Sequence, residues 1–107
     1  MDFPTAYALT IVIEAIVLFL ILRKERKTSE IVVNAVIAST LTLPFVWFGF
    51  GALALPWVMK TTMAEAFAVL VEAGFYRLAF EGMTIEKALL ASTVCNLASF
   101  IIGLLLL

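Results

Sequence analysis

The sequence contains no histidine and a single cysteine among its 107 residues. Without histidine, the chain lacks both the usual protein ligand of haem and zinc and the commonest general base. Cys95 cannot form a disulfide within the chain, and it lies in an apolar run without a neighbour that would stabilise a thiolate. We therefore expect no cofactor and no metal site, and we interpret Cys95 as a small packing residue.

Charged residues are also scarce, at 14% of the chain, whereas hydrophobic residues make up 64%. Soluble domains average about 25% charged and about 45–50% apolar residues, and a small soluble chain cannot cover so much apolar surface. The net charge of −1 excludes the basic surface of a nucleic-acid-binding protein. The composition predicts a multi-pass protein of the cell membrane, with the lipid bilayer as partner and no nucleic acid.

The apolar runs predict one all-α integral membrane domain over residues 1–107, with four transmembrane helices. About 20 helical residues cross the hydrocarbon core of a bilayer. The expected spans are residues 3–22, 30–50, 63–80 and 85–107. Pro44 should kink the second span because it removes a backbone donor. Residues 52–62 should form the next connection, with Trp57 at the level of the lipid headgroups.

One dense charge cluster sets the expected orientation in the membrane. It follows the first span and contains Arg23, Lys24, Arg26 and Lys27. Basic residues in a short loop favour the cytoplasmic side, so both chain termini should lie outside. A site for phosphate or lipid headgroups is the alternative interpretation of this cluster.

The two halves of the chain resemble two copies of one helical hairpin. Three pairs of short segments match in order: Ile11–Ala15 with Val69–Ala73, Thr28–Glu30 with Thr84–Glu86, and Ala38–Thr40 with Ala91–Thr93. Chance is the competing explanation, because lipid-facing segments use few residue types. If the duplication is real, both hairpins start outside and the repeats are parallel, related by an axis along the membrane normal.

Two carboxylates fall near the middle of predicted spans, Glu14 in the first and Glu72 in the third. A charged side chain at this depth costs about 2.5–3.5 kcal/mol on insertion scales, so both should face the interior of the bundle. Polar residues at the same depth can serve as neutral partners: Asn96, Tyr76, Ser39 and Thr42. A neutral carboxyl group both donates and accepts a hydrogen bond. We interpret these six residues as a site that binds a proton or exchanges it for a cation.

A second polar pattern follows one face of the fourth span. Ser92, Asn96, Ser99 and Gly103 recur with helical spacing. Small and hydrogen-bonding residues in such a stripe are typical of helix–helix contacts in lipid. We assign Ser92, Ser99 and Gly103 to interhelical packing and expect a homo-oligomer or a larger membrane complex.

Two functions fit these features. The first is proton- or cation-linked transport, by the protein alone or as a transporter subunit. The alternative is a non-catalytic scaffold or assembly subunit of a larger membrane complex, in which the same polar residues only join helices. An enzyme is not expected, because the chain shows no Ser-Lys or paired aspartate arrangement.

Overall fold

Helices account for most of the chain. The structure is a computed structural model that describes residues 3–106. Its α-helices are α1 (Phe3–Leu22), α2 (Thr28–Pro44), α3 (Trp57–Ala79) and α4 (Ile85–Leu106), and no strand occurs within that range. The predicted all-α class is therefore confirmed for this range. Residues 1, 2 and 107, and with them Asp2 and the two chain ends, lie outside the described residues.

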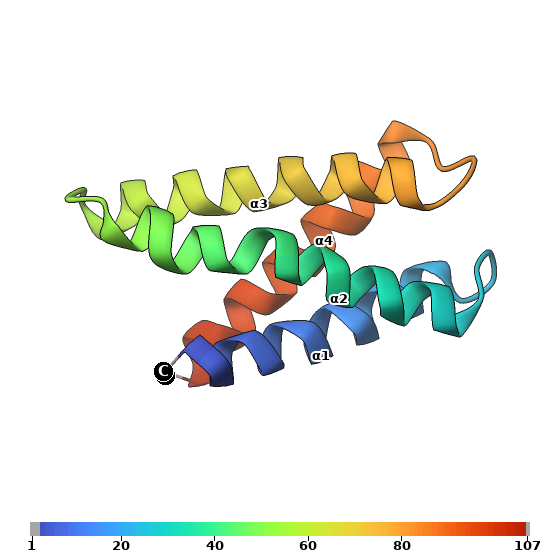
Figure 1. The fold of residues 1–107 in the computed structure, drawn as a ribbon, viewed down its shortest axis with the longest axis horizontal. Helices are drawn as coiled ribbons and strands as arrows, with labels where there is room; N and C mark the ends of the chain where they lie inside the picture. The colour runs from blue at the N-terminus through green and yellow to red at the C-terminus, as the bar shows by residue number, and fades with distance from the viewer. Residues whose placement is uncertain (1–2, 107) are drawn as a thin grey trace.

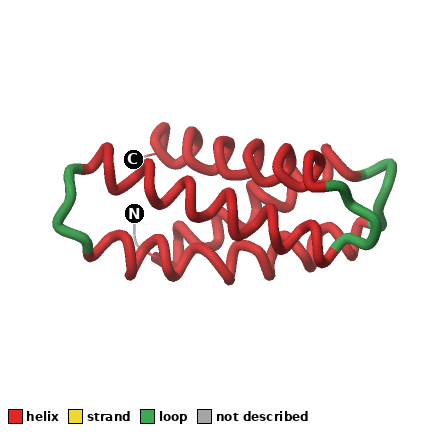
Figure 2. The backbone as a smooth tube through the Cα atoms, turned by 90° about the horizontal axis from the view of Figure 1, so that it is seen from above, coloured by secondary structure: helices red, strands yellow, loops and turns green. Residues whose placement is uncertain are grey.

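The helices form a ring in the order α1, α2, α3, α4, and α4 closes it by contacting α1. Figure 1 shows α1, α2 and α3 lying along the long axis while α4 crosses behind them. The loops at residues 23–27 and 80–84 lie together at one end, and the loop at residues 53–56 lies at the other (Figures 1 and 2). The ring therefore encloses one shared interior with two distinct ends.

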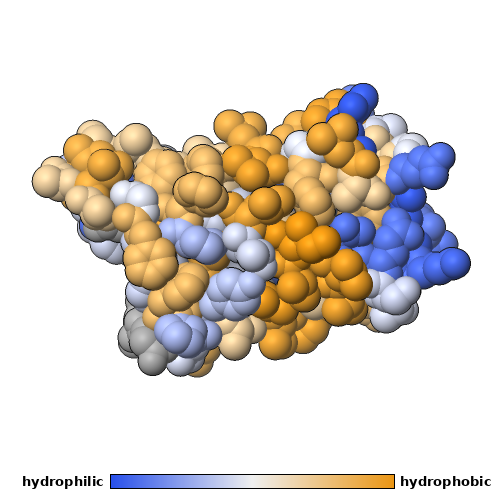
Figure 3. Space-filling view, viewed as in Figure 1, coloured by the Kyte–Doolittle hydropathy of each residue, from blue (hydrophilic) through white to orange (hydrophobic). Residues whose placement is uncertain are grey.

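Three helical segments are long and apolar enough to cross a membrane: Phe3–Leu22, Thr28–Gly49 and Ile85–Leu106. The molecule measures 41 × 24 × 19 Å, and its length matches a bilayer of about 40–45 Å with headgroups. Large apolar side chains such as Val12, Ile16 and Leu20 are more than half exposed. Figure 3 shows this hydrophobic surface over the middle of the molecule and hydrophilic residues gathered at the end with two loops. These features are those of a membrane protein.

The second span changes its winding at Pro44. After α2, the chain continues through a π-helical turn, η1 (Phe45–Gly49), and a 3-10 turn, η2 (Phe50–Ala52). Proline has no amide hydrogen and clashes with the preceding turn, and a wider turn accommodates both defects. The disturbance expected at Pro44 therefore takes the form of a π-helical turn.

The third helix starts earlier than the sequence predicts. It begins at Trp57 rather than at residue 63, so residues 57–62 are helical and the connection is reduced to residues 53–56. The amide groups of a first turn need no partner within the helix, and proline is therefore tolerated where Pro56 stands. The helices α1 and α4 begin and end within one residue of the predicted ranges 3–22 and 85–107, whereas α2 ends at Pro44, before residue 50.

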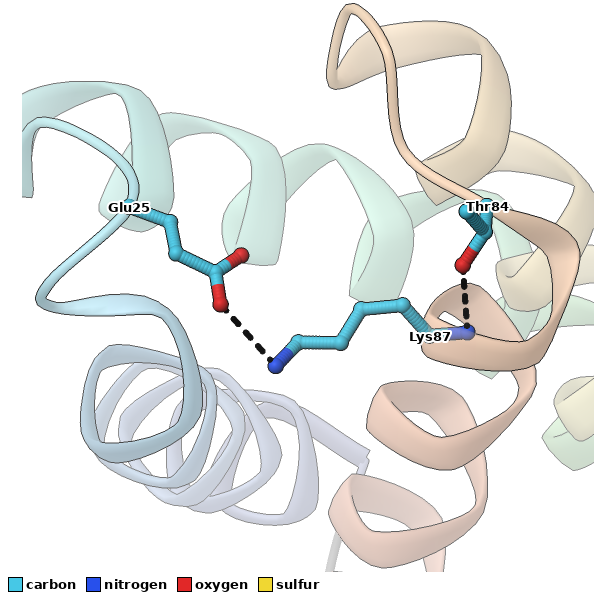
Figure 4. Close-up of polar contacts among 3 residues, drawn as sticks. All are labelled: Glu25, Thr84 and Lys87. Atoms are coloured by element: carbon cyan, nitrogen blue, oxygen red, sulfur yellow. Dashed lines mark hydrogen bonds and ion pairs between the residues drawn. The ribbon is translucent and has the colours of Figure 1, made fainter.

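At the hydrophilic end, an ion pair joins the 23–27 loop to the first turn of α4. The Lys87 ammonium lies 3.2 Å from Glu25 Oε1, and the Lys87 amide donates to the Thr84 hydroxyl at 3.2 Å (Figure 4). Gly82 permits the tight turn before α4 because its φ of 76° suits glycine alone among common residues. The ion pair is partly exposed, so it contributes about 1 kcal/mol at most.

Candidate functional site

The carboxyl groups of Glu14 and Glu72 both lie inside the ring. Glu14 of α1 is 1% exposed and Glu72 of α3 is 2% exposed. Their carboxyl groups contact Ser39 and Thr42, which are neighbours on one face of α2, and the two groups lie close enough to interact electrostatically. In an interior of low dielectric, two neighbouring ionised carboxylates repel strongly, and a proton on one of them removes that repulsion. Glu14 and Glu72 therefore form a carboxyl pair that is suited to holding a proton.

Hydroxyl groups of α2 contact both members of the pair. Ser39 donates a hydrogen bond to Glu14 Oε2. Thr42 Oγ1 lies 2.8 Å from Glu72 Oε2 and 3.1 Å from the carbonyl oxygen of Ala38. When Glu72 is ionised, the Thr42 hydroxyl can donate its hydrogen bond to the carboxylate. When Glu72 is protonated, Glu72 can donate to Thr42, and Thr42 can donate to the carbonyl of Ala38. The network thus has a hydrogen-bond arrangement for either state of Glu72.

The fourth helix supplies an amide on the other side of Glu72. Asn96 Nδ2 lies 3.4 Å from Glu72 Oε1 and 2.8 Å from the carbonyl oxygen of Ser92. The Ser92 hydroxyl donates to the carbonyl of Val69 at 2.7 Å, which ties α4 to α3. Of the two hydrogen bonds made by Asn96, the bond to Glu72 is longer and therefore weaker than the bond to the Ser92 carbonyl. All four helices therefore contribute to the surroundings of the carboxyl pair.

Tyr76 differs from the other predicted site residues. It is completely buried, one turn from Glu72 on α3, and its hydroxyl faces Glu72 without reaching hydrogen-bond geometry. A buried hydroxyl without a partner costs about 1–3 kcal/mol. Tyr76 is thus a spare donor beside the pair, which a change in side-chain positions can engage.

Apolar packing closes the interior on the side of the two loops. Leu18, Leu22, Ile31 and Phe80 are all 0% exposed. Leu18 and Leu22 lie in the second half of α1, Ile31 lies in the first half of α2, and Phe80 directly follows α3, all on the side of the pair toward residues 23–27 and 80–84. These four side chains carry no polar group that could lead water toward the pair.

On the opposite side of the pair lies a cavity of about 430 Å³. It extends from Trp57 and Lys60 in the first turns of α3 to Glu72 and Asn96 at its floor. Its wall is mainly apolar, with aromatic, aliphatic, small and polar side chains, and includes Thr10, Trp47, Phe50, Thr61, Glu65, Ser99, Phe100 and Gly103. The cavity therefore gives access to Glu72 from the end of the molecule that carries the 53–56 loop.

The residues that the sequence assigns to interhelical packing, Ser92, Ser99 and Gly103, differ in their surroundings. Ser99 and Gly103 line the cavity, and no heavy atom lies within 4 Å of a Cβ placed at Gly103. Ser92 does join two helices. Glu65 was missed by the sequence analysis although its spacing from Glu72 puts both on one helix face. That spacing was the available signal for a polar face on α3.

Comparison with known protein families, characterised proteins and solved structures gives no match to this chain. Within residues 3–106, no cluster of three or more carboxylate and thiol side chains has the geometry of a metal site. The chemistry of the site is therefore that of two carboxyl groups, their hydroxyl and amide partners, and the cavity beside them.

Proposed function

We propose that the protein is a small proton- or cation-linked membrane transporter, acting alone or as a subunit. The Glu14–Glu72 pair would hold the coupling proton and exchange it for a cation. The observation that carries the proposal is one-sided access: a cavity reaches Glu72 from one end, and apolar side chains close the other. Transporters that alternate between two sides of a membrane have this asymmetry in each of their end states.

The proposal includes α3 as a fourth membrane crossing. α3 is not among the three segments that are apolar enough by composition to cross a membrane, because it carries four charged residues: Lys60, Glu65, Glu72 and Arg77. Glu72 is buried and Glu65 is half-buried beside the cavity, so neither needs to face lipid. Lys60 and Arg77 lie toward the helix ends, where long basic side chains reach the headgroups.

We also propose the orientation that the basic cluster favours. The loop at residues 23–27, which contains that cluster, would lie in the cytoplasm together with residues 80–84, and the 53–56 loop outside. The cavity would then face outside. A membrane-impermeant thiol reagent applied to intact cells should label Leu55→Cys but not Glu25→Cys. Cys95, the only native cysteine, is fully buried and should stay unlabelled. The reverse labelling pattern would overturn the orientation.

A duplicated hairpin is supported by the buried positions. In α1 they include Ala6, Glu14, Leu18 and Leu22. The positions with identical spacing are Ala64, Glu72 and Tyr76 of α3 and Phe80 directly after it. The same holds for Ala35, Ala38, Ser39 and Thr42 of α2 and Ala88, Ala91, Ser92 and Cys95 of α4. Equivalent faces of two hairpins would thus pack against each other. The two glutamates would be related by the axis between the hairpins.

A scaffold is the second candidate, and one observation favours it. Ser39, Thr42 and Asn96 already give each carboxyl group a partner on another helix, which is sufficient to hold the bundle together. A pull-down from native membranes separates the candidates in part. A stoichiometric larger partner favours the scaffold or a transporter subunit, and a homo-oligomer alone favours an independent transporter.

The decisive experiment compares Glu14→Gln and Glu72→Gln with Glu81→Gln, an exposed carboxylate in the 80–84 turn. The melting temperature of the purified protein in detergent is measured over a range of pH, with and without monovalent and divalent cations. We expect the wild type and Glu81→Gln to respond to pH or cations. The two site variants should fold and lose the response. A wild type that responds to neither variable would favour the scaffold.

A further inference from the structure

The cavity above the carboxyl pair has the lining of a small-molecule site. Both tryptophans of the chain, Trp47 and Trp57, line it together with Phe50 and Phe100. The rings of Trp57 and Phe100 stack with centroids 6.5 Å apart. A volume of about 430 Å³ falls within the range of about 300–1,000 Å³ found for small-molecule pockets. The wall can therefore receive a mainly apolar molecule the size of a substituted ring.

Two further groups indicate the charge of that molecule. The Glu65 carboxyl lies on the wall, half-buried and apart from the Glu14–Glu72 pair. The Ser99 hydroxyl also lines the cavity, and its oxygen is buried without a hydrogen-bond partner among the described residues. Buried polar atoms in proteins are nearly always paired, so this hydroxyl is available to a ligand. Both groups accept hydrogen bonds, and aromatic faces attract cations.

We propose that the cavity binds an organic ammonium ion that carries a hydrophobic body and at least one N–H bond. The ammonium group would donate to Glu65 and Ser99, and the body would lie against the two tryptophans. A bare metal cation is a poorer fit, because it needs about six or more oxygen ligands and gains nothing from an apolar wall. Binding of a carboxylate is opposed by Glu65 and Glu72, which share the cavity with a single cation, Lys60.

This inference rests on the proposed function, since it names the cation that would exchange with the proton of the carboxyl pair. An ammonium ion in the cavity adds a positive charge next to Glu72, which lies at the floor. That charge favours the carboxylate over the carboxyl form. The O–H bond of the pair then breaks, the proton passes to water in the cavity, and the ammonium ion replaces its charge.

The two tryptophans make the test direct, because the intrinsic fluorescence of the protein comes from the wall of the cavity. The purified full-length protein is titrated in detergent with 2-phenylethylammonium. The neutral 2-phenylethanol and the anionic phenylacetate are matched controls for shape. We expect a saturable change in tryptophan emission with the ammonium compound only. Glu65→Gln should weaken binding by about 10- to 100-fold, the usual effect of losing a hydrogen bond to a charged group.

Two further variants keep the result interpretable. Ser99→Ala removes only a hydroxyl and should weaken binding by a few fold, up to about tenfold. Glu81→Gln alters an exposed carboxylate at the opposite end and should leave binding unchanged. Circular dichroism of each variant separates lost binding from lost folding. If Glu65→Gln does not fold, Glu65→Asp and Ser99→Ala carry the test.

The outcomes separate this inference from the proposed function. Equal binding of 2-phenylethanol, or unchanged binding by a folded Glu65 variant, overturns the ammonium site. Absence of saturable binding also overturns the ammonium site. In that case proton exchange at Glu14 and Glu72 is still supported if their variants lose the pH response. Saturable binding of the ammonium ion without any pH response in the wild type retains the ammonium site and refutes the proposed coupling.

Discussion

The contact between Thr42 and Glu72 offers a sharp test of how the carboxyl pair is held. Thr42→Val keeps the shape of the side chain and removes its hydroxyl, which lies 2.8 Å from Glu72 Oε2 with both residues buried. Hydrogen bonds to charged groups contribute about 1.5–3 kcal/mol in soluble proteins. Interhelical hydrogen bonds in a membrane protein average about 0.6 kcal/mol and reach about 1.7. We expect Thr42→Val to lower the free energy of unfolding by about 1–2 kcal/mol.

The matched control is Thr40→Val. The Thr40 hydroxyl is exposed and bonds to Tyr7 and to the carbonyl of Val36, away from the carboxyl pair. Its loss should change the free energy of unfolding by less than about 0.6 kcal/mol. Unfolding is followed by circular dichroism in mixed micelles with increasing denaturing detergent. The melting temperature in one mild detergent provides an independent check.

A double-mutant cycle with Glu72→Gln isolates the contact from general destabilisation. Residues in direct contact couple by about 0.5–3 kcal/mol, whereas distant sites are additive. Thr42 and Glu72 should show coupling of at least about 0.5 kcal/mol, and Thr40 and Glu72 should show none. Equal effects of the two valine variants, together with additive behaviour at Thr42, would refute the placement of Glu72 against α2.

The remaining predictions concern the fourth helix and the loops. Asn96→Leu should destabilise the protein by about 1–3 kcal/mol because Glu72 Oε1 loses a donor, and a melting temperature equal to wild type would exclude a core polar contact. Gly82→Ala should lower the free energy of unfolding by about 1 kcal/mol because the φ of Gly82 is positive. Gly74→Ala should be neutral or stabilising in the same denaturation assay, because there is open space around the new Cβ. Lys87→Met should change the free energy of unfolding by about 1 kcal/mol or less, and a larger loss would mean that its ion pair holds the hairpins together.

Sequence patterns were sufficient for most of the helices and for the burial of Glu14 and Glu72. The bounds of α1 were predicted because lipid demands an unbroken apolar run of defined length. Glu14 and Glu72 were expected inside the bundle because a charge facing lipid is too costly, and both are buried. The earlier start of α3 was missed because the polar residues 60–62 read as a connection, although polar residues are equally compatible with a first helical turn.

What the sequence by itself determined was therefore an all-helical chain whose long apolar segments suit a membrane, with acidic groups that must face inward. Only the tertiary structure decided that the two carboxyl groups are buried close together and that Thr42 and Asn96 contact Glu72 from different helices. It also decided that a cavity lined by Glu65 and Ser99 lies on one side of them. The reason is physical. Hydrophobic periodicity and transfer free energies depend on neighbours along one helix, whereas contacts and cavities depend on the angles at which helices cross and on how side chains fill the space between them.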